Sequence, residues 1–206
     1  MSSRLGLGAP ILIASLFCGV QAQVIEFESG GLTYRTLSKN GVTIMFAHLP
    51  SHVHEYAILQ VAVSNGSQAP STIRPEDFSF HRQDGGVVSA TPARTVVTAL
   101  IEKANRHDVI KLVSTYEMGL YGIARFRSTN GYEARRQAAL AEVSSTKIKA
   151  AAAASAIALV PTRLIPGQST DGAVFFPAAG RPLGPGRLIV QAAGEIFDFG
   201  AESLAP

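Results

Sequence analysis

Two strand-like stretches lie far apart in this chain, and the sequence between them has mostly helical character. The first, residues 56–65, is a long and mostly apolar run that ends in a polar Asn-Gly-Ser turn. The second, residues 164–177, is a Pro-Gly turn followed by a short run of bulky residues. Because the apolar side chains of both stretches need shelter from water, the stretches are predicted to close over one core. The pattern therefore predicts a mainly β fold with an α insert: an antiparallel β-sandwich interrupted by about three helices over residues 91–160.

Alternation of apolar and polar residues predicts the individual strands. A hairpin is expected over residues 31–47, because alternating runs flank Asn40-Gly41, a pair that tolerates the positive φ angles of a tight turn. In the run over residues 56–64, one alternate set is all aliphatic and is expected to face the core. That set is Ala57, Leu59, Val61 and Val63. Further strands are predicted over residues 77–82, 87–90, 172–176, 187–192 and 195–199, with a turn region at 71–75.

After residue 90 the apolar residues recur with the period of a helix. Thr91 is predicted to cap the first helix, with Pro92 at its first helical position. The buried stripe of this helix is expected to comprise Val97, Leu100, Ile101 and Ala104. A second helix is predicted over residues 109–120. A third is predicted from residue 130 or 131 to residue 159, because alanines fill its second half.

Residues 1–22 have the pattern of a secretion signal. One positive charge precedes an apolar run, and Val20-Gln21-Ala22 offers small residues where a signal peptidase reads, so we expect cleavage after Ala22. The alternative is an uncleaved membrane anchor, although the run is shorter than the roughly 20 residues of a spanning helix. Phe17 argues against a lipid anchor on Cys18, because a small residue is needed before that cysteine. We therefore expect a periplasmic or extracellular protein that has no membrane span after cleavage and no disulfide.

The charge balance does not indicate a nucleic-acid-binding protein. Removal of Arg4 with the signal leaves 18 − 1 = 17 basic and 15 acidic side chains, a net charge of +2. Residues 125–149 are locally basic, with Glu133 and Glu142 as the only acidic side chains. The basic residues are Arg125, Arg127, Arg135, Arg136, Lys147 and Lys149. This segment suits either an anionic partner, such as an envelope polymer or a lipid headgroup, or an ordinary solvated helix face.

Three stretches of the sequence together resemble a known family. They are LQVAVSN at residues 59–65, IRPEDFSF at 73–80 with the following Asp84-Gly85 turn, and LIPGQSTDGAVFF at 164–176. They resemble a group of bacterial extracellular immunoglobulin-like domains, described as telomeric-repeat-factor-like immunoglobulin domains. The resemblance implies an immunoglobulin-like sandwich within residues 23–200 of a secreted or surface protein. The insert at 91–160 departs from the simple domain, residues 201–206 are expected to form a frayed tail, and no functional residue carries over.

The clearest candidate site is a group of three histidines. His48, His52 and His54 follow an H-x3-H-x-H pattern, with Glu55 adjacent. In an extended chain, positions 52 and 54 face the same side, so two imidazoles there would bind one Zn²⁺ or Cu²⁺. The alternative interpretation is a solvated loop after Pro50, in which the histidines have no special role.

No catalytic signature is found in the chain. It lacks a G-x-S-x-G nucleophile elbow, and Glu76 and Asp77 are adjacent, so their side chains would face opposite sides of a strand. The Gly/Pro-rich residues 180–186 are interpreted as a turn between strands. The sequence therefore predicts a non-catalytic binding or envelope-assembly module, without a cofactor, whose partner is an envelope protein or an anionic surface polymer. Contact surfaces are expected on the insert and on the loops at 49–54 and 68–75. The alternative function is periplasmic metal binding by the three histidines.

Overall fold

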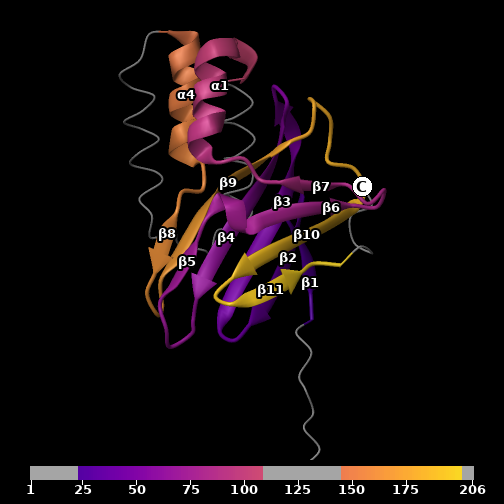
Figure 1. The fold of residues 1–206 in the computed structure, drawn as a ribbon, viewed down its shortest axis with the longest axis vertical. Helices are drawn as coiled ribbons and strands as arrows, with labels where there is room; N and C mark the ends of the chain where they lie inside the picture. Colours follow the sequence, from indigo (N-terminus) through magenta and orange to yellow (C-terminus); the bar gives the residue numbers. More distant parts are fainter. Residues whose placement is uncertain (1–22, 109–144, 201–206) are drawn as a thin grey trace, which may run out of the picture.

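The computed structural model describes residues 23–108 and 145–200, which form a mainly β structure with helices at one end (Figure 1). Within these ranges, every pairing between named strands is antiparallel. The predicted signal segment, the helix predicted over 109–120 and the predicted tail at 201–206 lie outside the described residues. In the part of the chain that is described, no helix combines the length and the apolar character needed to cross a membrane.

The larger sheet has five strands in the order β1-β2-β3-β4-β9. They are β1 (Ile25–Ser29), β2 (Leu32–Lys39), β3 (Val42–Val53), β4 (Tyr56–Asn65) and β9 (Ser169–Pro177). The predicted hairpin is confirmed, because β2 and β3 meet at Asn40 and Gly41, whose φ angles are 47° and 80°. β4 pairs with β9 from Tyr56–Pro177 to Ser64–Ser169. The two stretches that are far apart in the sequence are therefore direct neighbours in one sheet.

The smaller sheet has four strands in the order β11-β10-β6-β7. They are β6 (Phe78–Arg82), β7 (Val87–Ser89), β10 (Gly186–Ala192) and β11 (Glu195–Asp198). Each was predicted to within one residue at either end, because each shows alternation and is bounded by turn residues.

A third, two-stranded sheet was not predicted. It pairs β5 (Ser71–Ile73) with β8 (Thr162–Leu164), and a single 3-10 turn at Pro75–Asp77 follows β5. The interpretation of residues 71–75 as a turn region is therefore wrong for the first three. The partner of β5 is β8, which follows the helical segment in the chain. Whether residues form a strand depends on the partner strand as much as on local preference.

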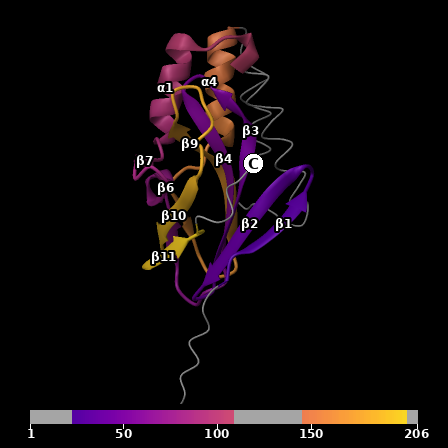
Figure 2. The ribbon, with the colours of Figure 1, turned by 90° about the vertical axis from the view of Figure 1, so that its right-hand side faces the viewer.

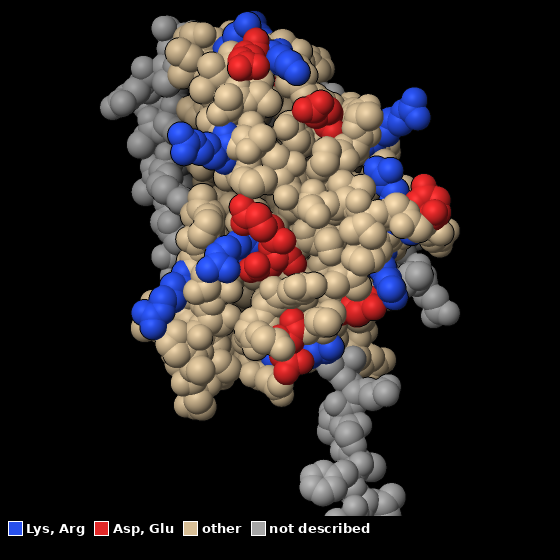
Figure 3. All heavy atoms as spheres, viewed as in Figure 1, with Lys and Arg blue, Asp and Glu red and all other residues tan. Residues whose placement is uncertain are grey.

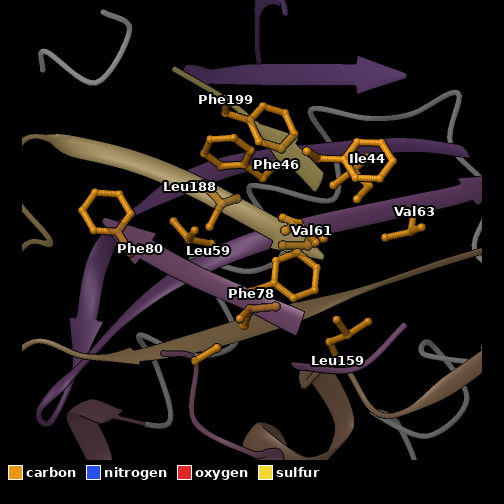
Figure 4. Packing of buried hydrophobic residues seen from close by; sticks show 14 of the residues in the cluster. Ile44, Phe46, Leu59, Val61, Val63, Phe78, Phe80, Leu159, Leu188 and Phe199 are labelled. Carbon is orange, nitrogen blue, oxygen red and sulfur yellow. The ribbon is translucent and has the colours of Figure 1, made fainter. Parts of the chain in front are cut away.

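An apolar core fills the space between the two larger sheets (Figure 4). From the larger sheet it takes Leu37, Ile44, Phe46, Leu59, Val61 and Val63, and from the smaller sheet Phe78, Phe80, Leu188, Val190 and Phe197. All of these side chains are at most 2% exposed. Full burial of one such side chain stabilises the fold by about 1.5–3 kcal/mol relative to exposure. The aliphatic face of β4 points into this core, as predicted.

The opposite face of β4 is buried as well. Two helices, α1 (Ala93–Lys103) and α4 (Thr146–Ile157), pack against each other beside the larger sheet (Figures 1 and 2). They form a second core with Tyr56, Ile58 and Ala62 from β4. Most of the α4 residues in this core are alanines, whose small side chains allow a close approach to the sheet. β4 is thus covered by the smaller sheet on one face and by the helices on the other, and most of its residues are apolar for that reason.

The details of the first helix differ from the prediction. Pro92 is the N-cap residue and Ala93 the first helical residue, while the backbone N–H of Thr91 donates to the carbonyl of Phe175 at 2.7 Å. The buried face contains Val96 and Leu100, whereas Ile101, which was predicted to be buried, is 48% exposed. Leu100 and Ala104 are buried as predicted and Val97 is partly buried, but packing against α4 and the sheet buries Val96 and leaves Ile101 exposed.

Gly172 is required where the chain leaves the helices. Residue 158 forms a parallel bridge with Ala173 of β9, and the N–H of Leu159 donates to the carbonyl of Ala173 at 2.8 Å. A Cβ on Gly172 would lie 2.6 Å from backbone atoms of Leu159. Glycine therefore allows the two backbones to approach this closely.

Candidate functional site

The three histidines of the predicted metal site occupy different environments. Residues 49–53 continue β3, so the predicted loop after Pro50 is wrong for these residues, and an irregularity shifts the strand register between His48 and His52. His54 lies in the turn after β3 with a positive φ of 50°. Its Nε2 atom is 3.3 Å from the Oδ2 atom of Asp108, which follows α1 in the chain. His54 thus faces the helical end of the molecule.

His48 is packed among aromatic rings in the core between the sheets. Its ring meets those of Phe46 and Phe80 nearly edge to face, with centroids 5.8 and 6.1 Å away. The side chain keeps some exposure, but its Nε2 atom is enclosed and has no hydrogen-bond partner among the described residues. Burial, together with the nearby Arg35 guanidinium, lowers the pKa of His48 to about 4. The imidazole is therefore neutral at pH 7 and acts as a core side chain.

The predicted metal ligands do not converge. Within residues 23–108 and 145–200, no three side chains of His, Asp or Glu lie together as a group that would hold a metal ion. The register shift in β3 and the turn at His54 explain why the spacing in the sequence does not become a shared site.

A hollow of about 730 Å³ opens at the end of the two sheets. We call it the terminal hollow. Its walls are the turn after β3, the turn between β6 and β7, and the connection from β9 to β10. The lining residues are Glu55, Arg82, Gln83, Asp84, Pro177, Ala178, Ala179, Arg181, Pro182, Leu183, Gly184 and Pro185.

Backbone hydrogen bonds join the three walls of the terminal hollow. The N–H of Ala178 donates to the carbonyl of Glu55 at 2.7 Å, and the N–H of Gln83 donates to the carbonyl of Pro185 at 3.1 Å. Ala179 and Gly184 have positive φ angles of 51° and 77°, which shape the connection between β9 and β10. Three prolines restrict the backbone further. The hollow is therefore preformed, as ligand sites usually are.

Four charged side chains line the terminal hollow, and they do not neutralise one another by contact. Neither Arg82 nor Arg181 forms an ion pair with a described carboxylate, although Glu55 and Asp84 lie in the same walls. The Nε atom of Arg82 is enclosed and has no acceptor among the described residues. A guanidinium that keeps free donors in a concave site is suited to bind an oxygen-rich ligand.

The sequence alone does not reveal this site. Residues 180–186 were interpreted only as a turn, and nothing local reveals that this turn meets Glu55 and Arg82. The cluster of three prolines and Arg181 within residues 177–185 is the one signal that was available. The predicted contact loop at 49–54 contributes to β3 instead, and only the neighbouring Glu55 reaches the hollow.

The predicted basic segment is only partly described. Its residues from Arg125 to Glu142 fall outside the described ranges. Lys147 lies in the first turn of α4, where its Nζ donates to the carbonyl of Glu102 at 2.8 Å. On the face drawn in Figure 3, basic and acidic side chains are interspersed rather than separated by sign. This face therefore has no extended basic surface.

Comparison with known proteins gave no match: no family model, no curated protein and no solved structure is similar to the chain. The resemblance to immunoglobulin-like domains therefore stays a prediction.

Proposed function

We propose that this protein is an exported, non-catalytic binding module and that the terminal hollow is its ligand site. The partner is an envelope component, either a protein or an anionic polymer, or a smaller molecule derived from one. The preformed hollow, whose two guanidinium groups form no ion pair with a described carboxylate, is the observation that carries the proposal.

The proposed scaffold is an immunoglobulin-like sandwich with a helical insertion over residues 91–160. Its support is the shared core between the five-stranded and four-stranded sheets, together with the position of α1 and α4 between β7 and β8 in the chain. In such scaffolds, the turns at the ends of the sheets form binding surfaces on a rigid frame. The three turns that line the terminal hollow occupy this position.

A binding role is supported by the composition of the hollow. Its lining combines apolar Ala178 and Leu183 with the charged groups of Arg82 and Arg181. The volume lies within the range of about 300–1,000 Å³ that is usual for small-molecule sites.

The proposal is tested by blocking the hollow. The isotope-labelled chain is titrated with soluble envelope extract, and the amide signals of Gly85 and Gly184 are followed by NMR. The proposal is supported if these signals shift and if Pro182→Trp abolishes the shifts. Pro182 is an exposed lining residue, so a tryptophan ring at this position would fill the hollow. Pro161→Trp, at an exposed proline outside the lining, is the matched control. Equal shifts in both variants would contradict the proposal.

Export is tested separately. The proposal that the protein acts outside the cytoplasm is supported by the charge, apolar run and small residues of positions 1–22. A fusion to a reporter enzyme that is active only after export should show activity. Leu12→Arg, which interrupts the apolar run, should abolish that activity. A reporter that stays inactive with the unchanged sequence would refute the proposed location and leave the binding site untouched.

A further inference from the structure

We infer that the terminal hollow binds a carboxylate and that Arg82 is the residue that holds it. The inference rests on the proposed binding function and names the chemical class of the ligand. It is carried by the position of Arg82, by the hydrogen-bonding state of its guanidinium, and by the charge balance of the lining.

Arg82 is placed by β6, in which Phe78 and Phe80 point into the core between the sheets. Alternation along the strand puts residue 82 on the same face, at the point where the core ends and the hollow begins. The backbone here is fixed on both sides, because Arg82 pairs with Gly186 of β10 and its N–H donates to the carbonyl of Gly86 at 2.8 Å. Arg82 is therefore held by a rigid strand end and not by a free loop.

The guanidinium of Arg82 lacks an acceptor where one is expected. Its Nε atom is enclosed, and none of the described residues accepts a hydrogen bond from it. An enclosed donor without a partner is rare and lowers stability. The two Nη groups of arginine together fit the two oxygens of one carboxylate. Because the Nε atom itself is enclosed, a ligand carboxylate in the hollow would be held through the Nη atoms of Arg82, which form no ion pair with a described carboxylate.

The acidic residues of the lining do not compete for this position. The Oδ1 atom of Asp84 accepts the N–H of Gly86 at 2.9 Å, so it stabilises the turn between β6 and β7. Glu55 is exposed on the turn after β3. With Arg82 and Arg181, these residues give the lining a formal charge of 2 − 2 = 0. The electrostatic potential of the lining therefore favours a ligand with a single carboxylate. A polyanion would be repelled by the two acidic side chains.

The remaining walls limit the body of the ligand. Ala178 and Leu183 are buried apolar residues beneath an opening lined by prolines. A carboxylate attached to a short apolar body matches this arrangement. Two sources supply that chemistry: a free organic acid and the C-terminus of a peptide chain.

The test is an NMR titration of the full chain with three probes. They are propionate, N-acetyl-tetra-alanine with a free C-terminus, and the same peptide with a C-terminal amide. Both carboxylates should shift the amide signals of Gly85 and Gly184 in a saturable way, and the amidated peptide should not. Tighter binding of the acidic peptide than of propionate identifies a chain end as the ligand, whereas equal or weaker binding identifies a free acid.

Arg82 variants assign the site. Arg82→Gln should weaken carboxylate binding by roughly tenfold to a hundredfold, because it removes charge-assisted hydrogen bonds. Arg82→Lys should recover part of the affinity, because it restores the positive charge but not the paired donors of the planar guanidinium. Arg187→Gln is the matched control, since Arg187 is an exposed strand residue paired with Asp198 at 3.0 Å, outside the lining. A native-like amide spectrum of each variant verifies the fold.

Two results would overturn the inference. The first is unchanged carboxylate binding by Arg82→Gln with a native-like spectrum. The second is binding of the amidated peptide as strong as that of the acid. Either leaves the proposed function standing, because the hollow would still bind a ligand by other contacts. If no probe shifts the amide signals of Gly85 and Gly184 while envelope extract does, only the carboxylate assignment fails.

Discussion

The rings of His48 and Phe80 stand nearly perpendicular, at 84°, although the two residues come from opposite sheets. The contact places a titratable group inside an aromatic cluster. Protonation would put a positive charge there, next to the guanidinium of Arg35, and this is why the pKa of His48 falls to about 4.

This contact makes stability depend on pH. Below a pH of about 6.5 the unfolded chain binds a proton at His48, whereas the folded chain does not until about pH 4. The contribution of His48 is therefore complete above pH 6.5 and is lost as the pH falls toward 4, by about 3 kcal/mol in total. Urea unfolding at a series of pH values measures this slope. His48→Phe should reduce it and His107→Ala, at an exposed site, should not; equal slopes in all three proteins would contradict the account.

Gln60 offers a way to stabilise the fold. It lies on the helix-facing side of β4, is 1% exposed, and neither amide atom has a hydrogen-bond partner among the described residues. Gln60→Leu removes both unsatisfied groups at similar volume, so the free energy of unfolding should rise by about 1–2 kcal/mol. Thermal and urea denaturation measure the change, and Gln191→Leu, at an exposed position of β10, is the comparison. A loss of stability in Gln60→Leu would mean that the amide has a partner.

Gly172 should not tolerate a side chain. Gly172→Ala places a Cβ against the backbone of Leu159, which has to move away from β9, so we expect a loss of about 3 kcal/mol or more. Gly31→Ala is the control, because its Cβ would meet no atom within 4 Å and only its positive φ of 78° is unfavourable. That strain is about 1–2 kcal/mol. Equal losses in the two variants would argue against a close approach at Gly172.

Asn65 joins segments that are far apart in the chain. Its Nδ2 atom donates to the carbonyls of Ala69 and Leu164, both at 2.9 Å, and its Oδ1 accepts from the hydroxyl of Ser67 at 2.6 Å. Asn65→Ala leaves several of these groups without partners and should lower the free energy of unfolding by about 2–3 kcal/mol. Ser67→Ala, which removes only the hydroxyl contacts near the surface, should have a clearly smaller effect. Chemical denaturation compares the two, and the reverse order would disprove this role for Asn65.

The arrangement of the histidines predicts the response to metal ions. Because His48 is enclosed in the aromatic core and His54 faces Asp108, Zn²⁺ should produce no saturable heat that requires all three imidazoles. Calorimetric titration of the purified chain, with His52→Ala as the control, measures this. Tight binding by the unchanged chain that is lost in His52→Ala would restore a metal site at β3.

Sequence reasoning succeeded where local chemistry decides the structure. Asn40-Gly41 determines a hairpin because few other pairs accept its φ angles, and the alternation in β6 and β10 determines which residues face the core. It failed where a segment that is distant in the chain determines the local structure or the burial. The partner of β5 lies beyond the helical segment, and the second buried face of β4 exists only because α1 and α4 cover it.

The site was harder to predict than the fold. The histidine spacing was visible in the sequence, but a register shift within β3 separates the side chains. The terminal hollow has no contiguous pattern, because Glu55 comes from the turn after β3, Arg82 from the end of β6 and Arg181 from the connection between β9 and β10, and these segments meet only after both sheets have paired.

The helical segment both leaves and rejoins the sheets on β9. Thr91 bridges Phe175, and residue 158 bridges Ala173, only two positions along the same strand. An excursion whose ends are fixed side by side can lengthen, shorten or be exchanged at its far end without altering the register of either sheet. The two sheets therefore depend on where this segment is attached to β9 and not on how long it is.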